Sequence, residues 1–188
     1  MKFVGDKIKK DGQIIDDSII KVDSFVNHQI DIKFAKKICK TFASKFKNAT
    51  KILTIESSGI AFAVLTSTFL KDIPVVFAKK TKSKSLDLNN IYKTKVKSFT
   101  KNTVYDVMIN KNFLNKKDKI LIVDDFLAEG SATKGLIEIC EEVKAKVIGV
   151  CVIVSKKFQG GEDFLKSKNI KLISGISIKN IRNNKIVF

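Results

Sequence analysis

The sequence predicts an α/β fold in which a twisted, mainly parallel sheet is flanked by helices. Apolar runs of strand length recur at 51–56, 119–126 and 146–155. Segments of helical character lie between them, and this alternation is typical of layered α/β proteins. The run at 146–155 is apolar almost throughout, as expected for a strand buried on both faces of a parallel sheet. A length of 188 residues suits one domain, so we assign residues 1–188 to a single unit.

The first half of the chain is predicted to supply helices and the first strands. Asp31 precedes a segment whose apolar residues recur every three or four positions, and aspartate is a favoured N-cap. KILTIE has the composition of a strand, and the glycine after it opens a turn into an apolar helix. The predicted elements are short helices at 3–10 and 18–26, a helix at 32–46, a strand at 51–56, a turn and helix at 57–71 and a strand at 74–78.

The second half contains a long polar stretch and then further strands and helices. Residues 79–103 are rich in lysine, serine and asparagine with little apolar periodicity, which indicates a functional or disordered loop. Beyond it the alternation resumes, and crossovers between parallel strands are expected to be right-handed. The predicted elements are strands at 119–126 and 146–155, helices at 131–143 and 162–168, and strands at 170–178 and 185–188 around an Asn-Asn turn.

Composition excludes several classes of function. The single histidine, His28, gives no basis for a protein-built zinc site or a serine–histidine triad. The three cysteines lie among apolar residues and form no CxxC pair, which favours buried thiols. No apolar stretch is long enough for a membrane helix, and the N-terminus does not have the pattern of a signal peptide. We therefore expect a cytoplasmic protein that does not engage a membrane.

The formal net charge of +17 raises the question of nucleic acid. Arg182 is the only arginine, whereas surfaces that read DNA rely on the planar fork of arginine. The lysines are scattered along the chain instead of gathered in one arm. We expect a positive surface field that attracts phosphorylated small molecules, and we do not expect nucleic acid as a partner.

The segment ILIVDDFLAEGSATKG at 120–135 carries the clearest chemical signal. An apolar strand delivers Asp124 and Asp125 to its carboxyl end, where open α/β sheets place their ligands. Small residues then open a helix whose first N–H groups are free to bind a phosphate. Carboxylates suit two vicinal hydroxyls or a magnesium ion, so the segment fits a ribose 5-phosphate. The alternative is a strand end with two solvated aspartates; the segment is not a Walker A loop.

This segment resembles the phosphoribosyl pyrophosphate motif of type I phosphoribosyltransferases. The resemblance extends nearly end to end to the bacterial branch of that family that acts on xanthine. It implies the type I phosphoribosyltransferase fold, purine salvage with xanthine and phosphoribosyl pyrophosphate as substrates, and a homodimer. It also implies Mg²⁺ bound through phosphoribosyl pyrophosphate, with no metal site built by the protein and no organic cofactor. The matching stretches are 21–31, 51–61, 73–83, 96–101, 120–130 and 155–161.

The resemblance assigns the sugar-phosphate end of the site. Asp124 and Asp125 would be the catalytic pair that faces the ribose hydroxyls. A small-residue loop would hold the 5-phosphate, and an earlier glycine-containing turn, 56–59, would approach the pyrophosphate, because glycine allows close backbone approach. The residues of the 5-phosphate loop are Ala128, Glu129, Gly130, Ser131 and Ala132, and the pyrophosphate turn contributes Ser57, Ser58 and Gly59.

The resemblance also assigns a lid and a purine site. A flexible lid at 79–103 would bring Lys80 and Lys82 over the leaving group. The purine would contact Ile20, Asn27 and Lys156 under a small hood formed by residues 1–30 and about 156–188. Lysine only donates hydrogen bonds and suits the O6 carbonyl of a 6-oxopurine, whereas asparagine also suits the 2-oxo edge of xanthine. Without the resemblance, these three residues have ordinary roles as core, turn and surface residues.

Four residues depart from the family pattern. Ile20 replaces a leucine, Phe62 stands where proline is common, and Glu129 adds a carboxylate to the phosphate loop. Ala128 stands where enzymes for hypoxanthine and guanine carry an aspartate, so we assign no general base. Two alternatives stay open: a hypoxanthine or guanine phosphoribosyltransferase, and a regulator of this fold that senses phosphoribosyl pyrophosphate and binds nucleic acid. A repressor of that kind would need an N-terminal module, whereas we expect the catalytic-type domain to begin near Met1, so we favour the enzyme.

Overall fold

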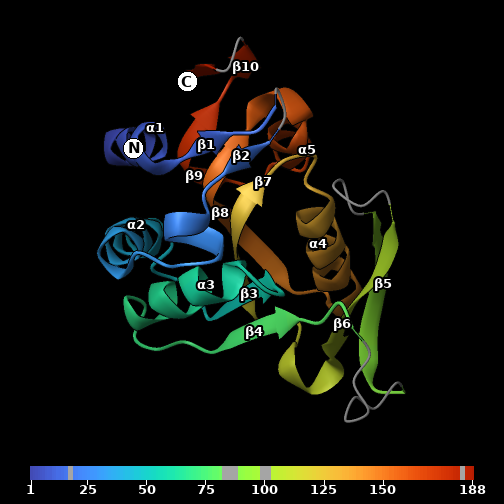
Figure 1. Ribbon diagram of the computed structural model, residues 1–188. Coiled ribbons are helices and arrows are strands. Elements are labelled where there is room, and N and C mark those ends of the chain that lie inside the picture. Colours follow the sequence, from blue (N-terminus) through green and yellow to red (C-terminus); the bar gives the residue numbers. More distant parts are fainter. Residues whose placement is uncertain (17–18, 82–88, 98–102, 183–184) are drawn as a thin grey trace.

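A computed structural model of the chain describes residues 1–16, 19–81, 89–97, 103–182 and 185–188. Its centre is a five-stranded sheet in the order β4-β3-β7-β8-β9, in which all neighbouring strands are parallel (Figure 1). This confirms the predicted fold class. The strands are β3 (Lys51–Ile55), β4 (Val75–Ala78), β7 (Lys119–Leu127), β8 (Lys146–Lys156) and β9 (Leu172–Ile178).

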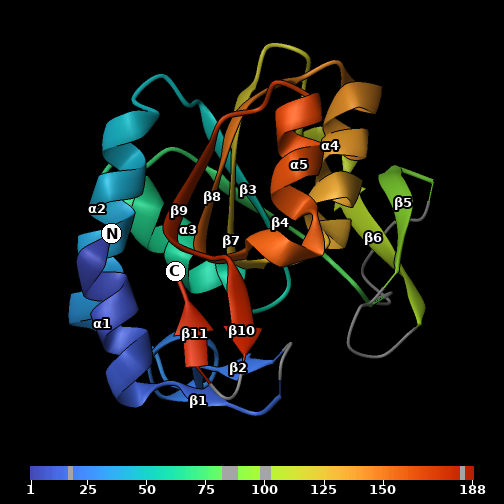
Figure 2. The same cartoon turned by 90° about the horizontal axis from the view of Figure 1, so that it is seen from above.

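Helices cover both faces of this sheet (Figure 2). One face packs against α1 (Lys2–Asp11), α2 (Ile32–Lys45) and α3 (Gly59–Thr68), and the other against α4 (Ser131–Val143) and α5 (Gly161–Ser167). The buried apolar residues accordingly form two clusters, one on each side of the sheet. The predicted helices at 32–46 and 131–143 are confirmed, because their apolar periodicity matches the face that each helix buries.

The two ends of the chain lie side by side near the carboxyl ends of the strands (Figures 1 and 2). There β1 (Gln13–Ile14) pairs with β2 (Ile20–Lys21), and β10 (Asn180–Arg182) pairs with β11 (Lys185–Val187). The Asn-Asn turn expected between β10 and β11, at 183–184, lies outside the described residues. The predicted helix at 18–26 is wrong: pairing with β1 makes 20–21 a strand, and only Asp23–Asn27 forms a π-helical turn.

The predicted loop at 79–103 contains a strand, which corrects the sequence analysis. Residues Ile91–Lys97 (β5) pair antiparallel with Val104–Asn110 (β6), and the hairpin packs against α4. Val96 is buried and closely approaches Gly135 of α4, where a Cβ would lie 2.5 Å from Val96 Cγ2. The alternation of lysine with Thr94 and Val96 was the missed signal, because a period of two predicts a strand. The remaining loop residues, 82–88 and 98–102, lie outside the described residues.

Asp31 caps α2 as predicted. Its Oδ1 accepts a hydrogen bond from Phe34 N at 3.0 Å, and its Oδ2 accepts one from Lys7 Nζ at 2.8 Å. These two donors, Lys7 first, hold the pKa of the Asp31 carboxyl below its ordinary value. We expect Asp31→Ala to lower the free energy of unfolding by about 1 kcal/mol. Asp31→Asn, which keeps an acceptor for Phe34 N, should lower the free energy of unfolding by less than Asp31→Ala does.

The contribution of Asp31 to the free energy of unfolding should depend on pH. Because the folded-state pKa is lowered, the carboxylate stabilises the protein above its unfolded-state pKa of about 3.9, and this contribution is lost as the pH falls through that value and below. Urea unfolding of the wild type and the two variants at pH 7 and at decreasing pH measures the effect. If the difference in the free energy of unfolding between wild type and Asp31→Ala stays constant down to pH 3, the expected pH dependence is contradicted.

Candidate active site

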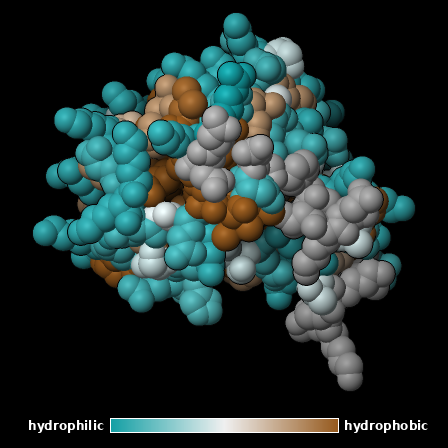
Figure 3. Space-filling view, turned by 45° about the horizontal axis from the view of Figure 1, so that its top comes forward, coloured by the Kyte–Doolittle hydropathy of each residue, from teal (hydrophilic) through white to brown (hydrophobic). Residues whose placement is uncertain are grey.

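A cavity of about 640 Å³ opens at the carboxyl ends of β3, β7 and β8. Figure 3 shows a hollow with apolar walls on this side of the molecule, surrounded by hydrophilic side chains. The position is the one at which open parallel sheets bind their ligands, because loops and helix N-termini converge there. The lining residues are Ile19, Ile20, Ile55, Glu56, Ser57, Ser58, Lys80, Thr81, Asp124, Asp125, Phe126, Ala128, Ala132 and Lys156.

The acidic pair lies at the end of β7. Asp124 is only 6% exposed, and its Oδ1 accepts a hydrogen bond from Asp125 N at 2.9 Å. The Oδ1 atom of Asp125 accepts one from Phe126 N, also at 2.9 Å. Burial raises the pKa of Asp124 well above its ordinary value, the negative charge of Asp125 raises it further, and the positive charge of Lys80 opposes the rise. Such a pair is stabilised by hydroxyl donors or by a cation.

The acidic pair fits a magnesium ion that a substrate also ligates. Mg²⁺ prefers oxygen ligands and is commonly held by one or two carboxylates together with substrate phosphates. Among the described residues, no group of three or more potential metal ligands gathers at one place. Asp124 and Asp125 would supply two carboxylates to such an ion, and the oxygens of a ligand would complete its coordination sphere.

The loop before α4 and the start of this helix contribute Ala128 and Ala132 to the cavity lining. Gly130 precedes the helix with φ 77°, a left-handed conformation that glycine adopts without strain. No side chain of the described residues caps this helix, so its first backbone N–H groups are available to an anion. Gly161 N donates to Ala128 O at 3.0 Å and holds the loop against α5. A Cβ on Gly161 would lie 2.5 Å from Ala128 O, so only glycine allows this contact.

The turn between β3 and α3 forms a second wall of the cavity. Ser57 and Ser58 line it, and the peptide bond between Glu56 and Ser57 is cis. Gly59 begins α3 and lies against the acidic pair: a Cβ there would be 2.4 Å from Thr54 Oγ1 and 2.8 Å from Asp124 Oδ1. The glycine is thus required for packing of the turn on Asp124.

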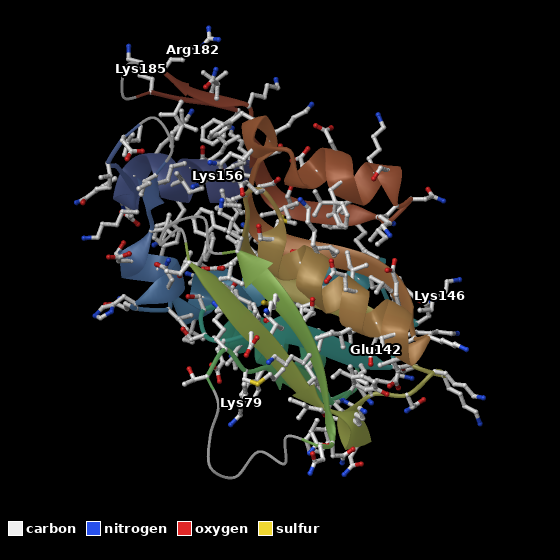
Figure 4. All side chains as sticks on the ribbon, turned by 90° about the vertical axis from the view of Figure 1, so that its right-hand side faces the viewer. Lys79, Glu142, Lys146, Lys156, Arg182 and Lys185 are labelled. Carbon is white, nitrogen blue, oxygen red and sulfur yellow. The ribbon has the colours of Figure 1, made fainter. Side chains whose placement is uncertain are left out.

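Another part of the cavity wall combines a buried cation with apolar groups. Lys156, the last residue of β8, is 8% exposed, and its Nζ lies 5.4 Å from the centroid of the Phe126 ring. Burial lowers the pKa of Lys156, and the charge of Asp16 opposes this shift. Ile20 of β2 is buried and lines the same cavity. Figure 4 shows Lys156 between the N-terminal segment and the central sheet.

The structure brings most of the predicted site residues to this one cavity. Asn27 does not line it and is exposed at the end of the π-helical turn, and Lys82 lies outside the described residues. The predicted residues that line the cavity are Ile20, Ser57, Ser58, Lys80, Asp124, Asp125, Ala128, Ala132 and Lys156. Gly59 follows the lining residue Ser58, and Glu129, Gly130 and Ser131 lie between the lining residues Ala128 and Ala132.

Sequence reasoning missed Phe126, which also lines the cavity, whereas it placed Glu56 in the pyrophosphate turn without assigning a contact to its carboxylate. Phe126 follows the acidic pair and lies two positions after Asp124, so the alternation of a strand would have placed these two side chains on one face. Glu56 lies in the predicted turn, but nothing in the sequence indicated a contact for its carboxylate.

The fold and the cavity together define an α/β protein with a ligand-binding site at the carboxyl edge of a parallel sheet. The sequence pattern of the phosphoribosyl transferase domain matches residues 22–183, and the chain belongs to this family of enzymes. It is 43% identical over 190 aligned residues to xanthine phosphoribosyltransferase 1 of Clostridium perfringens, with 100% of each chain covered. The xanthine phosphoribosyltransferases of Clostridium tetani and Clostridioides difficile are each 44% identical to it, again over 100% of both chains.

Solved structures share the fold. Adenine phosphoribosyltransferase from Trypanosoma brucei, in complex with AMP, pyrophosphate and ribose-5-phosphate, superposes with a TM-score of 0.74 at 16% identity, covering 93% of this chain and 79% of that one. The enzyme from Thermoanaerobacter pseudethanolicus gives 0.72 at 19% identity, with 92% and 98% covered. The predicted type I phosphoribosyltransferase fold is therefore confirmed. None of the described helices is long and apolar enough to cross a membrane.

Proposed function

We propose that this enzyme transfers the phosphoribosyl group of 5-phosphoribosyl 1-pyrophosphate to xanthine, which yields xanthosine 5′-monophosphate and pyrophosphate in purine salvage. The observation that carries the proposal is a single cavity lined by two chemically different groups of residues. One group comprises the acidic pair and the free start of α4, and the other is a buried lysine beside an aromatic ring. The full-length relatives named xanthine phosphoribosyltransferase support the choice of purine.

At the sugar-phosphate end, the 5-phosphate would lie on the loop from Ala128 to Ala132, where backbone N–H groups donate to it. Asp124 and Asp125 would accept from the ribose hydroxyls. These two carboxylates would also help to hold Mg²⁺, which when bound neutralises charge on the pyrophosphate. Ser57 and Ser58 would donate hydroxyl hydrogen bonds to the pyrophosphate oxygens. The proposal is supported by the position of all these groups around one cavity.

At the purine end, Lys156 would donate to the O6 carbonyl. Its burial strengthens this hydrogen bond, because a charged donor interacts more strongly where water is excluded. Ile20 and Phe126 would pack on the faces of the base. Asn27 remains a prediction from the resemblance: it is exposed outside the cavity lining and would have to approach the 2-oxo edge when the base binds.

The proposed reaction is displacement of pyrophosphate at the anomeric carbon, through a state with oxocarbenium character. The protein would lower the barrier by orienting the two substrates and by placing charge where the leaving group develops it. Lys80 lines the cavity and would offset negative charge on the pyrophosphate, and closure of a lid within 79–103 would exclude water. Ala128 has no titratable group, so we assign no general base there.

The test is turnover with xanthine, hypoxanthine and guanine, each with phosphoribosyl pyrophosphate and Mg²⁺, followed by pyrophosphate release. Xanthine should give the highest kcat/KM. If kcat/KM is tenfold or more higher with hypoxanthine or guanine, that base is the substrate instead of xanthine. Absence of turnover with all three purines would overturn the proposal. A gel-shift at physiological salt tests the regulator, for which we expect no specific nucleic-acid binding.

Lys156 provides a prediction for the purine end. Lys156→Met keeps an apolar side chain of similar length against Phe126 but removes the donor, so the KM for xanthine should rise by about tenfold or more, as expected for a charged hydrogen bond. The KM for phosphoribosyl pyrophosphate should change by less than about twofold, because that substrate binds at the other end. Steady-state kinetics with each substrate varied in turn measures both, and an unchanged xanthine KM would remove Lys156 from the purine site.

The proposal includes a cytoplasmic homodimer, as the resemblance implies. The three cysteines are free and buried, which suits a reducing compartment. Burial raises the pKa of Cys39 to about 11 and that of Cys140 to about 12, so both thiols stay protonated at neutral pH. Sedimentation equilibrium distinguishes a dimer from the 21.0 kDa monomer.

A further inference from the structure

Glu56 is a carboxylate in the wall of a cavity that is expected to hold pyrophosphate. It directly follows β3 and lines the cavity together with Ser57, Ser58 and Lys80. A negative charge beside a polyanionic ligand weakens binding, even where solvent screens part of the repulsion. Recognition of pyrophosphate therefore gives no reason for a carboxylate at this position, and its contacts suggest a different role.

The contacts of Glu56 extend the pairing between β3 and β4. The ladder between these strands ends with the pair Ile55 and Ala78. Beyond it, Glu56 N donates to Ala78 O at 3.1 Å, and the Glu56 side chain continues in the same direction: its Oε2 accepts a hydrogen bond from Lys80 N at 3.1 Å. A side-chain oxygen thus takes the place of a strand partner for Lys80.

The backbone next to Lys80 is held on its other side by the β5–β6 hairpin. Lys79 N donates to Met108 O at 2.9 Å, and Met108 N donates to Lys79 O at 3.0 Å. Lys79 is therefore attached to β6 and Lys80 to the end of β3. With both bonds in place, the chain leaves β4 along a defined path and enters the predicted lid with Lys80 facing the cavity.

The side chain of Lys80 acts on the reacting end of the site. Its Nζ lies 5.3 Å from the ring centroid of Tyr105, and its positive charge lowers the pKa of Asp124 against the effect of burial. Lys80 itself is exposed, so neither burial nor packing fixes its long side chain. The backbone hydrogen bond to Glu56 and the contact with Tyr105 are the restraints that direct its charge toward the cavity.

We propose that Glu56 is a positioning residue for phosphoribosyl pyrophosphate: through its hydrogen bond to the Lys80 backbone, it directs the Lys80 ammonium toward the pyrophosphate. This rests on the function proposed above. Glu56 does not itself bind the substrate, and its oxygen atom, not its charge, is the group that matters. The hydrogen bond that the Glu56 oxygen accepts from Lys80 N favours substrate binding by more than the negative charge of Glu56 opposes it.

Two variants of Glu56 separate the acceptor from the charge. Glu56→Gln and Glu56→Ala both remove one negative charge, but only glutamine keeps an oxygen that can accept from Lys80 N. We expect Glu56→Gln to keep the wild-type KM for phosphoribosyl pyrophosphate or to lower it. Glu56→Ala should raise that KM about tenfold above that of Glu56→Gln, which corresponds to the loss of one hydrogen bond. The KM for xanthine should be the same in both.

A double-mutant cycle tests whether Glu56 acts through Lys80. Lys80→Ala alone should raise the KM for phosphoribosyl pyrophosphate, and adding Glu56→Ala should change it little further, because the ammonium to be positioned is already absent. The inhibition constant of pyrophosphate should likewise rise in Lys80→Ala and change little further when Glu56→Ala is added. Equal kinetics of Glu56→Ala and Glu56→Gln, or additive effects in the cycle, would overturn the proposal.

Two controls keep the outcomes distinct. Thermal unfolding of each variant reports whether the fold is intact, and Glu56→Gln provides a folded reference with the same net charge as Glu56→Ala. If the wild-type protein turns over none of the three purines, the proposed function fails, and the positioning role is then tested by binding of pyrophosphate alone to the wild type and the same variants. Loss of pyrophosphate binding in Glu56→Ala but not in Glu56→Gln is the result expected in that assay.

Discussion

Replacing both aspartates at the end of β7, Asp124→Asn with Asp125→Asn, should lower kcat by at least about a thousandfold, because removal of preorganised charge at a reacting centre has effects of this size. Asparagine keeps the shape of the side chain and its oxygen still accepts from the next backbone N–H, as Asp124 does from Asp125 N. The variant should therefore fold, and the loss of turnover will report the charge of the pair alone.

The Asp124→Asn part of this substitution should increase the stability of the protein, although the double substitution lowers kcat. Burial raises the pKa of Asp124, so the folded protein binds its proton more tightly than the unfolded chain does. The stability of the wild type then falls as the pH rises from the unfolded-state value of about 3.9 through the raised folded-state value. An asparagine at this position does not titrate. We therefore expect Asp124→Asn to raise Tm at pH 7, with a gain over wild type that shrinks on acidification.

Calorimetry from pH 4 to pH 8 measures this gain, and pyrophosphate release measures kcat on the same samples. Asp125→Asn is the matched control, because it replaces the neighbouring carboxylate, which is only half-buried. Near-normal turnover of the double variant would refute the role of the pair in the reaction. A wild type that is as stable as Asp124→Asn at pH 7 would refute the account of the buried charge.

Gly59→Ala should impair both stability and turnover. The new Cβ would lie 2.4 Å from Thr54 Oγ1 and 2.8 Å from Asp124 Oδ1, distances at which one group has to move. Thr54 is completely buried and Asp124 nearly so, which leaves little room for movement. Overpacking of this kind costs about 1–3 kcal/mol. A shift of Asp124 by about 1 Å should in addition lower kcat by up to about a hundredfold.

Gly5→Ala in α1 is the control for Gly59→Ala. It is also a glycine in a helix, but its Cβ would meet nothing closer than Ile176 Cδ1 at 3.5 Å. Alanine favours the helix by about 0.5–1 kcal/mol, so this variant should be at least as stable as wild type and fully active. Urea unfolding and kcat of both variants decide the matter. A Gly59→Ala protein with wild-type kcat would show that the turn does not hold Asp124 in place.

Local signals in the sequence were sufficient for the elements whose residues are contiguous. The carboxylate of Asp31 and the periodicity behind it predicted α2, and the small residues after the acidic pair predicted the start of α4. The formation of α2 and of the start of α4 depends on hydrogen bonds and packing within one or two helical turns. The prediction failed for β2, because a strand of two residues is determined by its partner, Gln13–Ile14, which lies elsewhere in the chain. It failed for β5 because the period of two in that segment was missed.

The sequence by itself predicted the sugar-phosphate half of the proposed site, because the acidic pair and the helix start adjoin in one segment, 120–135, whose chemistry can be read directly. Only the tertiary structure decided which residues form the other walls. It placed Phe126 beside Lys156, gave Gly59 its contact with Asp124, and left Asn27 outside the cavity lining. It also joined Glu56 to Lys80 across two parallel strands. These relations depend on strand register and on the approach of distant segments, which no local pattern encodes.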